Sequence, residues 1–251
     1  MLYTVERQDN LTQGVYSLWC RCEETLRRPR PGQFVHAACG ERLLLRRPIS
    51  ICDVDGNRLR LVFDTVGEGT RWLSRRQPGD TLDLLAPLGH GYSFSSPEKI
   101  LLVGGGLGVP PMVYCARQAG GSADAVVGFR DSSRVILTEE MRAFCGSVTL
   151  MTDDGSAGEK GFVDAAVRRL LTEGHYQKVL ACGPKVMLRA VAGAAAEAGV
   201  PCQVSMEERM ACGIGACRVC ACKVKEEEDV HTYKRACVDG PVFNAAEVDF
   251  S

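Results

Sequence analysis

Four cysteines near the C-terminus constrain the fold of this 251-residue chain more than any other feature. Three of them fall within one short stretch and the fourth follows after a longer gap; they are Cys212, Cys217, Cys220 and Cys237. Gly213 and Gly215 let the backbone of that stretch bend tightly and bring its amides toward sulfur atoms. Roughly the last fifty residues otherwise offer little aliphatic core, so we expect them to depend on a bound metal group.

The spacing C-x4-C-x2-C with a distant fourth cysteine is that of 2Fe–2S clusters of the plant ferredoxin type. A structural zinc site is the alternative, but zinc usually takes paired C-x2-C hairpins and only one such pair occurs here. Cys222 is a second alternative, because it offers another third ligand two residues beyond Cys220. We prefer Cys220, whose spacing fits, and expect the Cys222 side chain to point the other way. The predicted ligands are therefore Cys212, Cys217, Cys220 and Cys237.

Composition excludes several classes of protein. The formal net charge of -1 argues against a nucleic-acid binder, whose domains are usually basic. No apolar run reaches the length of a membrane span, and residues 1–10 lack the layout of a signal peptide. We therefore expect a cytoplasmic protein in a reducing compartment, where disulfides are rare. Most of the nine remaining cysteines are expected to be small buried hydrophobic residues; they are Cys20, Cys22, Cys39, Cys52, Cys115, Cys145, Cys182, Cys202 and Cys222.

Sequence patterning divides the chain into three parts. Residues 1–96 contain short β-runs separated by turn signals, as at 32–37, 59–63 and 81–85, and a helix near Gly69-Thr70, which together predict an antiparallel β-barrel. Residues 97–204 alternate strands and helices, which predicts a parallel sheet covered on both faces. The strands are expected at 100–103, 125–129, 148–151 and 178–181, and the helices at 112–118, 163–171 and 184–198. Residues 205–251 form a small C-terminal cluster module, so the predicted fold class is a β-barrel plus an α/β domain and this module.

A flavin site is predicted at Arg47-Pro48-Ile49-Ser50, which lies on a strand of the predicted barrel. An arginine followed by a hydroxyl three residues later resembles the flavin signature of the ferredoxin–NADP reductase superfamily. By that resemblance, Arg47 neutralises the FAD pyrophosphate and Ser50 approaches the edge of the isoalloxazine ring. One strand later, residues 67–70 open a helix whose amides favour phosphate, although a simple tight turn would leave the same pattern.

A nicotinamide site is predicted where an apolar strand meets a helix. Glycines at this junction allow a pyrophosphate to approach the backbone; they are Gly104, Gly105, Gly106 and Gly108. Cys182 and Gly183 also follow a strand and open a helix, and in the same superfamily this position places a cysteine near the nicotinamide ring. A buried thiol at a helix start is the alternative for Cys182.

The choice between NAD and NADP depends on two neighbouring residues. Asp131 is expected to close the second strand, roughly twenty residues past the glycines, where an acid can bond the ribose hydroxyls and favour NAD. Arg130 can instead receive a 2′-phosphate. Residues 152–156, with Lys160-Gly161 beyond, predict either a second loop over the nucleotide or an Asp/Gly turn.

The order of barrel, nucleotide domain and cluster module resembles the electron-transfer subunits of two-subunit, NAD-dependent dihydroorotate dehydrogenases. The segments that carry the resemblance are 46–50, 104–108, 152–156, 207–217 and 233–243. It implies an FAD-binding barrel, an NAD-binding α/β domain and FAD contacts at Arg47, Pro48, Ile49, Ser50, Val62, Phe63, Asp64, Gly69 and Thr70. Asp64 departs from the pattern, because an acid repels a phosphate, so we expect it to contact FAD through its backbone.

The resemblance also implies a place in pyrimidine biosynthesis. A separate FMN-containing catalytic subunit would oxidise dihydroorotate, and its electrons would pass through the 2Fe–2S cluster to FAD and then to NAD+. It implies a two-plus-two heterotetramer, in keeping with the frequency of dimeric cores. No catalytic acid–base residue is assigned. The alternatives are a reductase subunit serving ferredoxin, polysulfide or another dehydrogenase, and a zinc-stabilised nucleotide-binding regulator without redox turnover.

Overall fold

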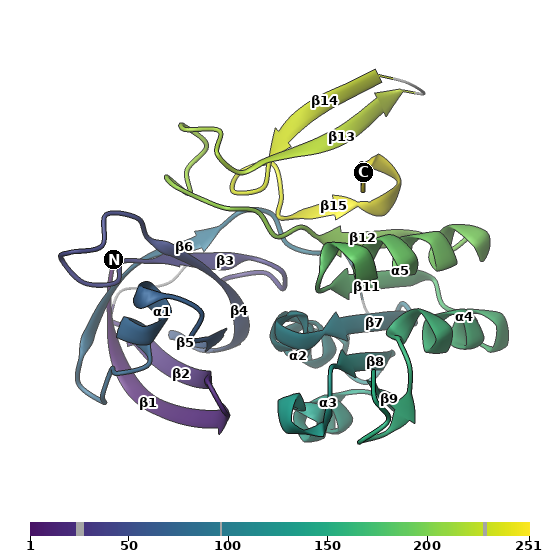
Figure 1. Ribbon diagram of the computed structural model, residues 1–251, viewed down its shortest axis with the longest axis horizontal. Helices are drawn as coiled ribbons and strands as arrows, with labels where there is room; N and C mark the ends of the chain where they lie inside the picture. Colours follow the sequence, from purple (N-terminus) through teal and green to yellow (C-terminus); the bar gives the residue numbers. More distant parts are fainter. Residues whose placement is uncertain (24–27, 96, 228–229) are drawn as a thin grey trace.

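The computed structural model describes residues 1–23, 28–95, 97–227 and 230–251. Figure 1 shows a barrel on the left, a sheet with helices on the right, and a C-terminal hairpin above both. The predicted fold class is confirmed, since the barrel is closed and antiparallel and the second part is built on parallel strands. Within the described residues, no helix is long and apolar enough to cross a membrane.

The barrel closes from six strands in the order β1-β2-β5-β4-β3-β6. Their bounds are Leu2–Thr12 (β1), Val15–Cys22 (β2), Phe34–Ala37 (β3), Arg47–Asp55 (β4), Arg58–Asp64 (β5) and Thr81–Leu88 (β6). Alternate residues point inward, because side chains along a strand alternate between its two faces. Val35, Ile51 and Leu82 therefore pack in the barrel interior. The short helix α1 (Glu68–Leu73) follows β5 as expected and buries Leu73.

The second part is a seven-stranded sheet in the order β10-β9-β8-β7-β11-β12-β15. Its strands are β7 (Ile100–Gly105), β8 (Ala123–Phe129), β9 (Val148–Thr152), β10 (Glu159–Lys160), β11 (Lys178–Cys182), β12 (Cys202–Ser205) and β15 (Val242–Asn244). All neighbours pair in parallel except β12 and β15, which are antiparallel.

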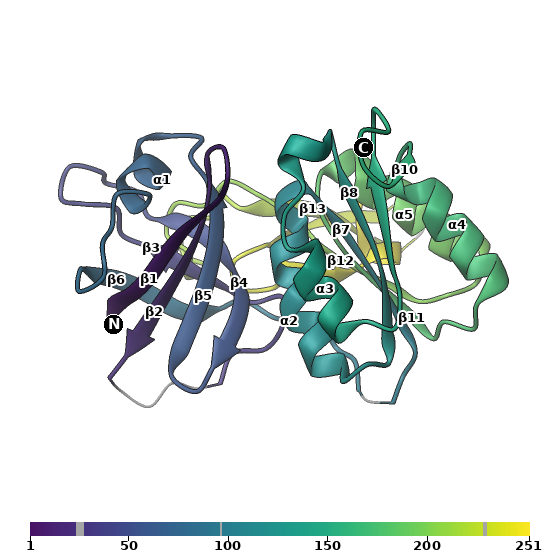
Figure 2. The same cartoon turned by 90° about the horizontal axis from the view of Figure 1, so that it is seen from below.

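Helices cover both faces of this sheet. The helices α2 (Val109–Ala119) and α3 (Thr138–Phe144) lie on the side that faces the barrel, and α4 (Val163–Glu173) and α5 (Lys185–Glu197) lie on the other (Figure 2). Along β7, Leu102 packs with α2 while Leu101 and Val103 pack with α4 and α5. Burial on both faces explains why this strand is a continuous apolar run.

Some element bounds differ from the sequence-based expectations. β8 ends at Phe129, and Asp131 instead caps the 3-10 turn η2 (Ser132–Arg134) that follows. Helix α2 begins at Val109, directly after the 3-10 turn η1 (Gly106–Gly108), and α3 was not predicted. The boundary predicted between residues 204 and 205 falls inside β12.

The C-terminal module is better buried than its composition suggests. Its hairpin is formed by β13 (Ala221–Glu227) and β14 (Val230–Arg235), after which β15 and the 3-10 turn η3 (Ala245–Glu247) return to the sheet edge. Cys222, Phe243 and Val248 belong to the same buried cluster as the sheet residues facing α4 and α5. The expectation of little core is therefore wrong for this segment, because the sheet shares its core with the module.

Candidate functional site

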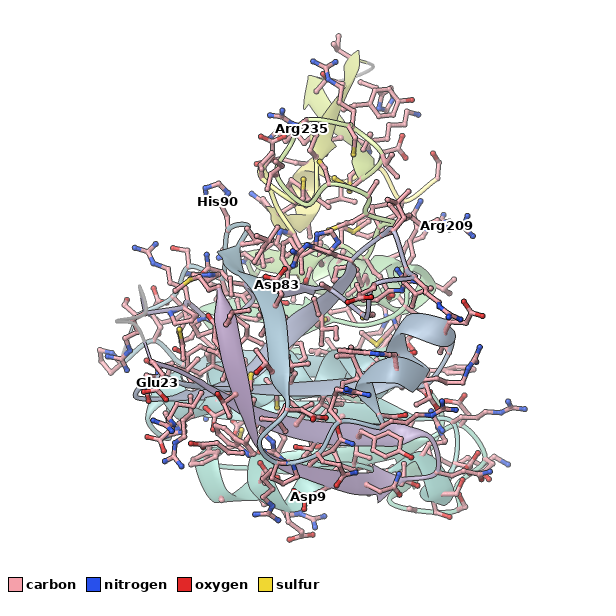
Figure 3. The ribbon with its side chains drawn as sticks, turned by 90° about the vertical axis from the view of Figure 1, so that its left-hand side faces the viewer. Asp9, Glu23, Asp83, His90, Arg209 and Arg235 are labelled. Atoms are coloured by element: carbon pink, nitrogen blue, oxygen red, sulfur yellow. The ribbon has the colours of Figure 1, made fainter. Side chains whose placement is uncertain are left out.

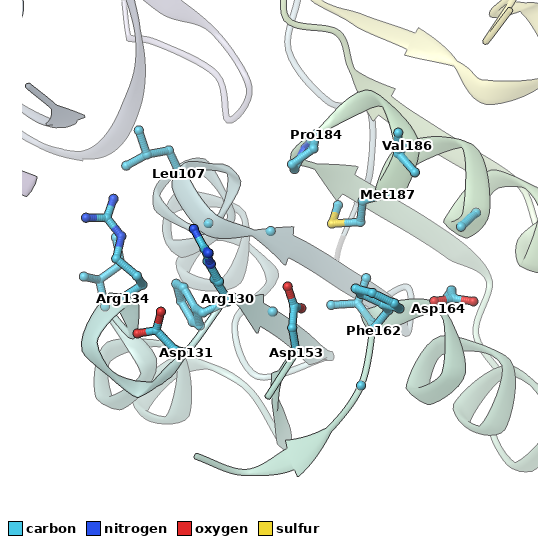
Figure 4. Close-up of a pocket in the computed structure, with 18 of the residues that line it drawn as sticks. Leu107, Arg130, Asp131, Arg134, Asp153, Phe162, Asp164, Pro184, Val186 and Met187 are labelled. Atoms are coloured by element: carbon cyan, nitrogen blue, oxygen red, sulfur yellow. The ribbon is translucent and has the colours of Figure 1, made fainter. Parts of the chain in front are cut away.

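A cavity of about 820 Å³, here called the sheet cavity, opens at the carboxyl ends of β7, β8 and β11 (Figure 4). Open parallel sheets usually bind ligands at this edge. Gly105 and Gly106 line the cavity, and Gly106 has a φ of +54°, which favours glycine. Gly108 must also lack a side chain, since a Cβ there would overlap the carbonyl of Cys182. The glycine run thus keeps the backbone accessible and lets two strand ends meet.

The sheet cavity brings together the residues considered for nucleotide selection. Arg130, Asp131 and Asp153 all line it. The carboxylate of Asp131 accepts the Ser133 amide at 2.9 Å, and the Ser132 amide donates to Ser156 Oγ at 2.7 Å. The loop at 152–156 therefore contacts the turn after β8. A role of this loop over the nucleotide stays a prediction. NAD over NADP stays a prediction, because both Arg130 and Asp131 reach this space.

A second cavity of about 460 Å³, here called the interface cavity, lies between the barrel and the sheet. Most of the predicted flavin residues line it, and they are Pro48, Ile49, Ser50, Val62, Phe63, Asp64 and Thr70. The sheet contributes Gly105, Gly106, Gly108, Cys182 and Gly183. Gly105, Gly106, Leu107 and Pro184 line both cavities, so ligands in the two spaces would meet at this shared wall.

Three predicted residues lie outside the walls of both cavities, and they are Arg47, Gly69 and Gly104. The Arg47 side chain packs on the start of α1, where a Cβ at Gly69 would stand 2.5 Å from the Arg47 Nε atom. This places a guanidinium beside the first amides of that helix. Gly104 is buried at the end of β7, and a Cβ there would stand 2.9 Å from the Cα of Val109. Its role is to let η1 and α2 turn closely over the strand.

The carboxylate of Asp64 has a partner from the other domain. Arg134 in η2 donates from Nη2 to Asp64 Oδ2 at 2.7 Å and from Nη1 to the carbonyl of Gln13 at 3.0 Å. Asp64, whose acidic side chain departs from the family pattern, therefore forms an ion pair with Arg134 of the α/β domain. Contact between the Asp64 backbone and FAD stays a prediction.

Several residues that line the two cavities were not predicted from the sequence. The interface cavity also takes Phe34, Met206, Glu207, Glu208, Met210 and Pro241, and the sheet cavity takes Phe162, Asp164 and Met187. No local spacing marks these side chains. Residues 207–210 lead directly into Cys212, so the wall of the interface cavity continues into the cysteine loop.

The first two cysteines of the loop lie together. The Cys217 amide donates to Cys212 Sγ at 3.4 Å. This amide and those of Ile214 and Ala216 lower the pKa of the Cys212 thiol to about 6. Gly213 and Gly215, with φ of +71° and +86°, allow the bend that aims the amides at one sulfur. The loop backbone therefore favours a thiolate at neutral pH.

The third and fourth cysteines meet at the base of the hairpin. The Ala236 amide donates to the Cys220 carbonyl at 2.8 Å, which brings the chain ends of β13 and β14 together. The Cys237 thiol lies beside those of Cys220 and Cys212, and burial first, then Cys220, raises its pKa to about 12. The long gap between the third and fourth cysteine is thus spanned by the hairpin.

The thiol of Cys222 lies near Cys220 and Glu208. Its Sγ lies 3.9 Å from the carbonyl of Cys220, and burial, followed by Glu208, raises its pKa to about 12. The reason given for setting it aside was wrong, because residues two apart share one face of a strand. Cys220 precedes β13, whereas Cys222 lies within it, and the choice of Cys220 as the third ligand stays a prediction.

The four predicted ligands lie near one another: Cys212 is beside Cys217, and Cys237 is beside both Cys220 and Cys212. Across the described ranges, no three His, Cys, Asp or Glu side chains gather tightly enough for a single ion. Zinc takes its four ligands around one ion, whereas a 2Fe–2S cluster takes two cysteine thiolates on each of its two irons. Arg235 donates from Nη1 to the Gly215 carbonyl at 3.1 Å and braces the loop from the projecting module (Figure 3). The C-x4-C-x2-C spacing and the amides that face Cys212 fit a 2Fe–2S cluster.

Comparison with known proteins agrees with this geometry. Residues 207–249 match the family model for the iron-sulfur cluster binding domain of dihydroorotate dehydrogenase B. The chain is 40% identical over 255 residues to the electron transfer subunit of dihydroorotate dehydrogenase B (NAD(+)) from Bacillus caldolyticus, covering 98% of this chain and 96% of the relative. The Fusobacterium nucleatum subunit of the same name is 38% identical over 258 residues, covering 98% and 97% of the two chains.

Solved structures show the same architecture. A chain from the structure of an NADH-dependent reduced ferredoxin-NADP oxidoreductase is 31% identical with a TM-score of 0.88, covering 100% of this chain and 90% of that one. The ferredoxin reductase of carbazole 1,9a-dioxygenase, at 24% identity and a TM-score of 0.67 over 80% of this chain and 66% of that one, shares the fold. The family predicted from the sequence is confirmed: this chain belongs to the electron transfer subunits of dihydroorotate dehydrogenase B.

Proposed function

We propose that this chain carries electrons between a dihydroorotate-oxidising catalytic subunit and NAD, as a step in pyrimidine biosynthesis. FAD occupies the interface cavity, NAD(H) the sheet cavity, and a 2Fe–2S cluster the four cysteines. The observation that carries this proposal is the shared wall at Gly105-Gly106, together with the segment 206–210, which lines the interface cavity and leads into the cysteine loop. Its support is the family to which the chain belongs.

The residues have distinct tasks in this proposal. Arg47 and the start of α1 hold the FAD pyrophosphate, and Ser50 contacts the isoalloxazine edge. The glycines at 104–108 admit the nicotinamide nucleotide, and Asp131 binds its ribose. When bound, FAD converts the single electrons of the cluster into the electron pair that a nicotinamide accepts. No proton-transfer residue is needed, since the chain's task is to orient the rings and exclude water.

The partner is proposed to be an FMN-containing catalytic subunit in a two-plus-two heterotetramer. The relatives are named as subunits, so a catalytic partner belongs to their holoenzymes. On this chain, Ile214 and Val219 flank Cys217 and expose 61% and 53% of their surface. Exposed apolar residues grouped around a proposed metal ligand suit a surface that a partner covers. A cytoplasmic location stays a prediction.

Reconstitution tests the proposal. The purified chain is expected to be coloured and to contain one FAD and two irons, because it would hold one flavin and one binuclear cluster. Added to its catalytic subunit, it is expected to support NAD+-dependent oxidation of dihydroorotate. A colourless sample that contains zinc would contradict it. So would a coloured protein that neither binds an FMN dehydrogenase subunit nor lends it activity with NAD+.

A second function is favoured by one observation. The chain from the NADH-dependent reduced ferredoxin-NADP oxidoreductase aligns along the whole length of this protein. A subunit serving a ferredoxin-linked reductase would have the same three parts. Co-purification separates the two: recovery with a ferredoxin-linked flavoprotein, and reduction of ferredoxin in place of dihydroorotate turnover, would favour the second.

A further inference from the structure

One histidine on the outer face of the barrel is completely buried. Val35 and Ala37 of β3 pack in the barrel interior, so the alternation of the strand turns Phe34 and His36 outward. His36 nevertheless has an exposed fraction of 0%. The cysteine loop covers it, because a Cβ at Gly213 would overlap Nδ1 of the imidazole.

The ring of His36 is enclosed without a hydrogen-bond partner. Among the described residues, neither Nδ1 nor Nε2 makes a hydrogen bond of normal geometry. Burial lowers the pKa of His36, and the nearby backbone carbonyls of Arg46 and Cys212 act in the opposite direction. Buried polar groups are nearly always hydrogen-bonded in native proteins. An unpaired imidazole beside a proposed cluster ligand therefore indicates that the ring forms a hydrogen bond when the site is complete.

The surroundings of the ring are held in place. Arg46 donates from Nη1 to the His36 carbonyl at 3.2 Å and to the Asp83 carbonyl at 3.0 Å, which ties β3 to the start of β4 and to β6. Phe34, two residues away on the same face, lines the interface cavity. Since residues two apart in a strand are separated by about 7 Å, His36 stands between the interface cavity and the cysteine loop.

We propose that His36 is a positioning residue for the 2Fe–2S cluster. Its imidazole packs beneath the Cys212–Gly213 peptide. When a cluster occupies the loop, the ring donates an N–H to the Cys212 carbonyl, which fixes the loop against the barrel beside the flavin. The ring can lie this close only because residue 213 is glycine, since a Cβ there would overlap Nδ1. The inference rests on the proposed function, since it requires a cluster in this loop.

The reduced cluster provides the test, because its electron paramagnetic resonance spectrum responds to the geometry of its ligands. In the full chain, His36→Leu keeps the bulk of the side chain and removes the donor. We expect wild-type FAD content, an altered spectrum after dithionite reduction, and a severalfold faster loss of iron to a chelator. His36→Asn places an amide N–H near the position of Nδ1 and should restore the wild-type spectrum.

A matched control separates positioning from general stability. Val35→Ala changes the neighbouring residue on the inner face of the same strand, so it should lower the melting temperature and leave the spectrum unchanged. A His36→Leu spectrum and iron-release rate equal to those of Val35→Ala would overturn the inference. If His36→Leu does not fold, His36→Ala and His36→Asn decide it: identical spectra count against the inference, and a wild-type spectrum for Asn alone supports it. Absence of any cluster signal in the wild-type chain would instead overturn the proposed function.

Discussion

The pKa of a cysteine thiol is shifted in opposite directions in two regions of the molecule. It is raised in the interior of the barrel and sheet, and it is lowered at Cys212 in the cysteine loop at 212–220. Seven of the nine cysteines outside the predicted ligand set are buried, as expected, and burial raises the pKa of thiols such as Cys115 and Cys202. In the loop, three backbone amides lower the pKa of Cys212. The number of cysteines therefore says little about ligation. Several backbone amides aimed at one sulfur distinguish the loop, because interior thiols such as Cys115 also have other thiols nearby.

The largest expected effect is loss of the cluster. Cys217→Ser should abolish the cluster, because the variant lacks one of the four thiolate ligands of the irons. Cys222→Ser should retain the cluster. Iron content and visible absorption of the two purified variants provide the measurement. If Cys222→Ser loses the cluster while Cys220→Ser retains it, the distinction between loop and interior thiols is wrong, because an interior thiol would then be the ligand.

Thiol reactivity should differ almost as strongly. Burial raises the pKa of Cys202 to about 12 in the folded chain. Because the shift is upward, its thiol stays protonated as the pH rises from 7 to 9, with roughly one molecule in a thousand ionised at pH 9. Alkylation followed by mass spectrometry should therefore find Cys202 unmodified throughout this range in the native protein and modified after denaturation. A steady rise with pH in the native protein would contradict the burial argument.

Backbone conformation should matter more in the loop than in the interior. Gly213→Ala adds a Cβ at a φ of +71° and against His36, so we expect a loss of about 1–3 kcal/mol in stability and reduced iron content. Thermal unfolding and iron analysis measure both. Unchanged values would mean that the loop does not need this conformation.

The smallest expected effect has the opposite sign. Gly193 lies within α5, and a Cβ there would meet nothing within 4 Å. Gly193→Ala should raise the free energy of unfolding by about 0.5–1 kcal/mol, because alanine has the higher helix propensity. Chemical denaturation measures it, with cluster content as the control. A destabilised variant would show that α5 requires glycine for a reason other than space.

Local patterns predicted those parts of the site whose chemistry depends on neighbours in the chain. The glycines at 104–108 and the residues at 47–50 came from short motifs, and β7, β11 and α4 came from hydrophobic periodicity. Helix α3 was not predicted because it is short. Strand β15 was not predicted because it depends on pairing with β12. Glu207, Glu208 and Phe162 line cavities only because distant elements place them there.

The sequence by itself determined the kind of chemistry: four thiols at ligand spacing, two glycine-rich turns after strands, and an arginine–serine pair on a barrel strand. These are local features, since a turn or loop acquires its shape from a few consecutive residues. The tertiary structure alone decided that Arg134 pairs with Asp64, that the two cavities share a wall, and that His36 lies beneath Gly213. Each joins elements far apart in the chain, and such contacts depend on how whole domains pack.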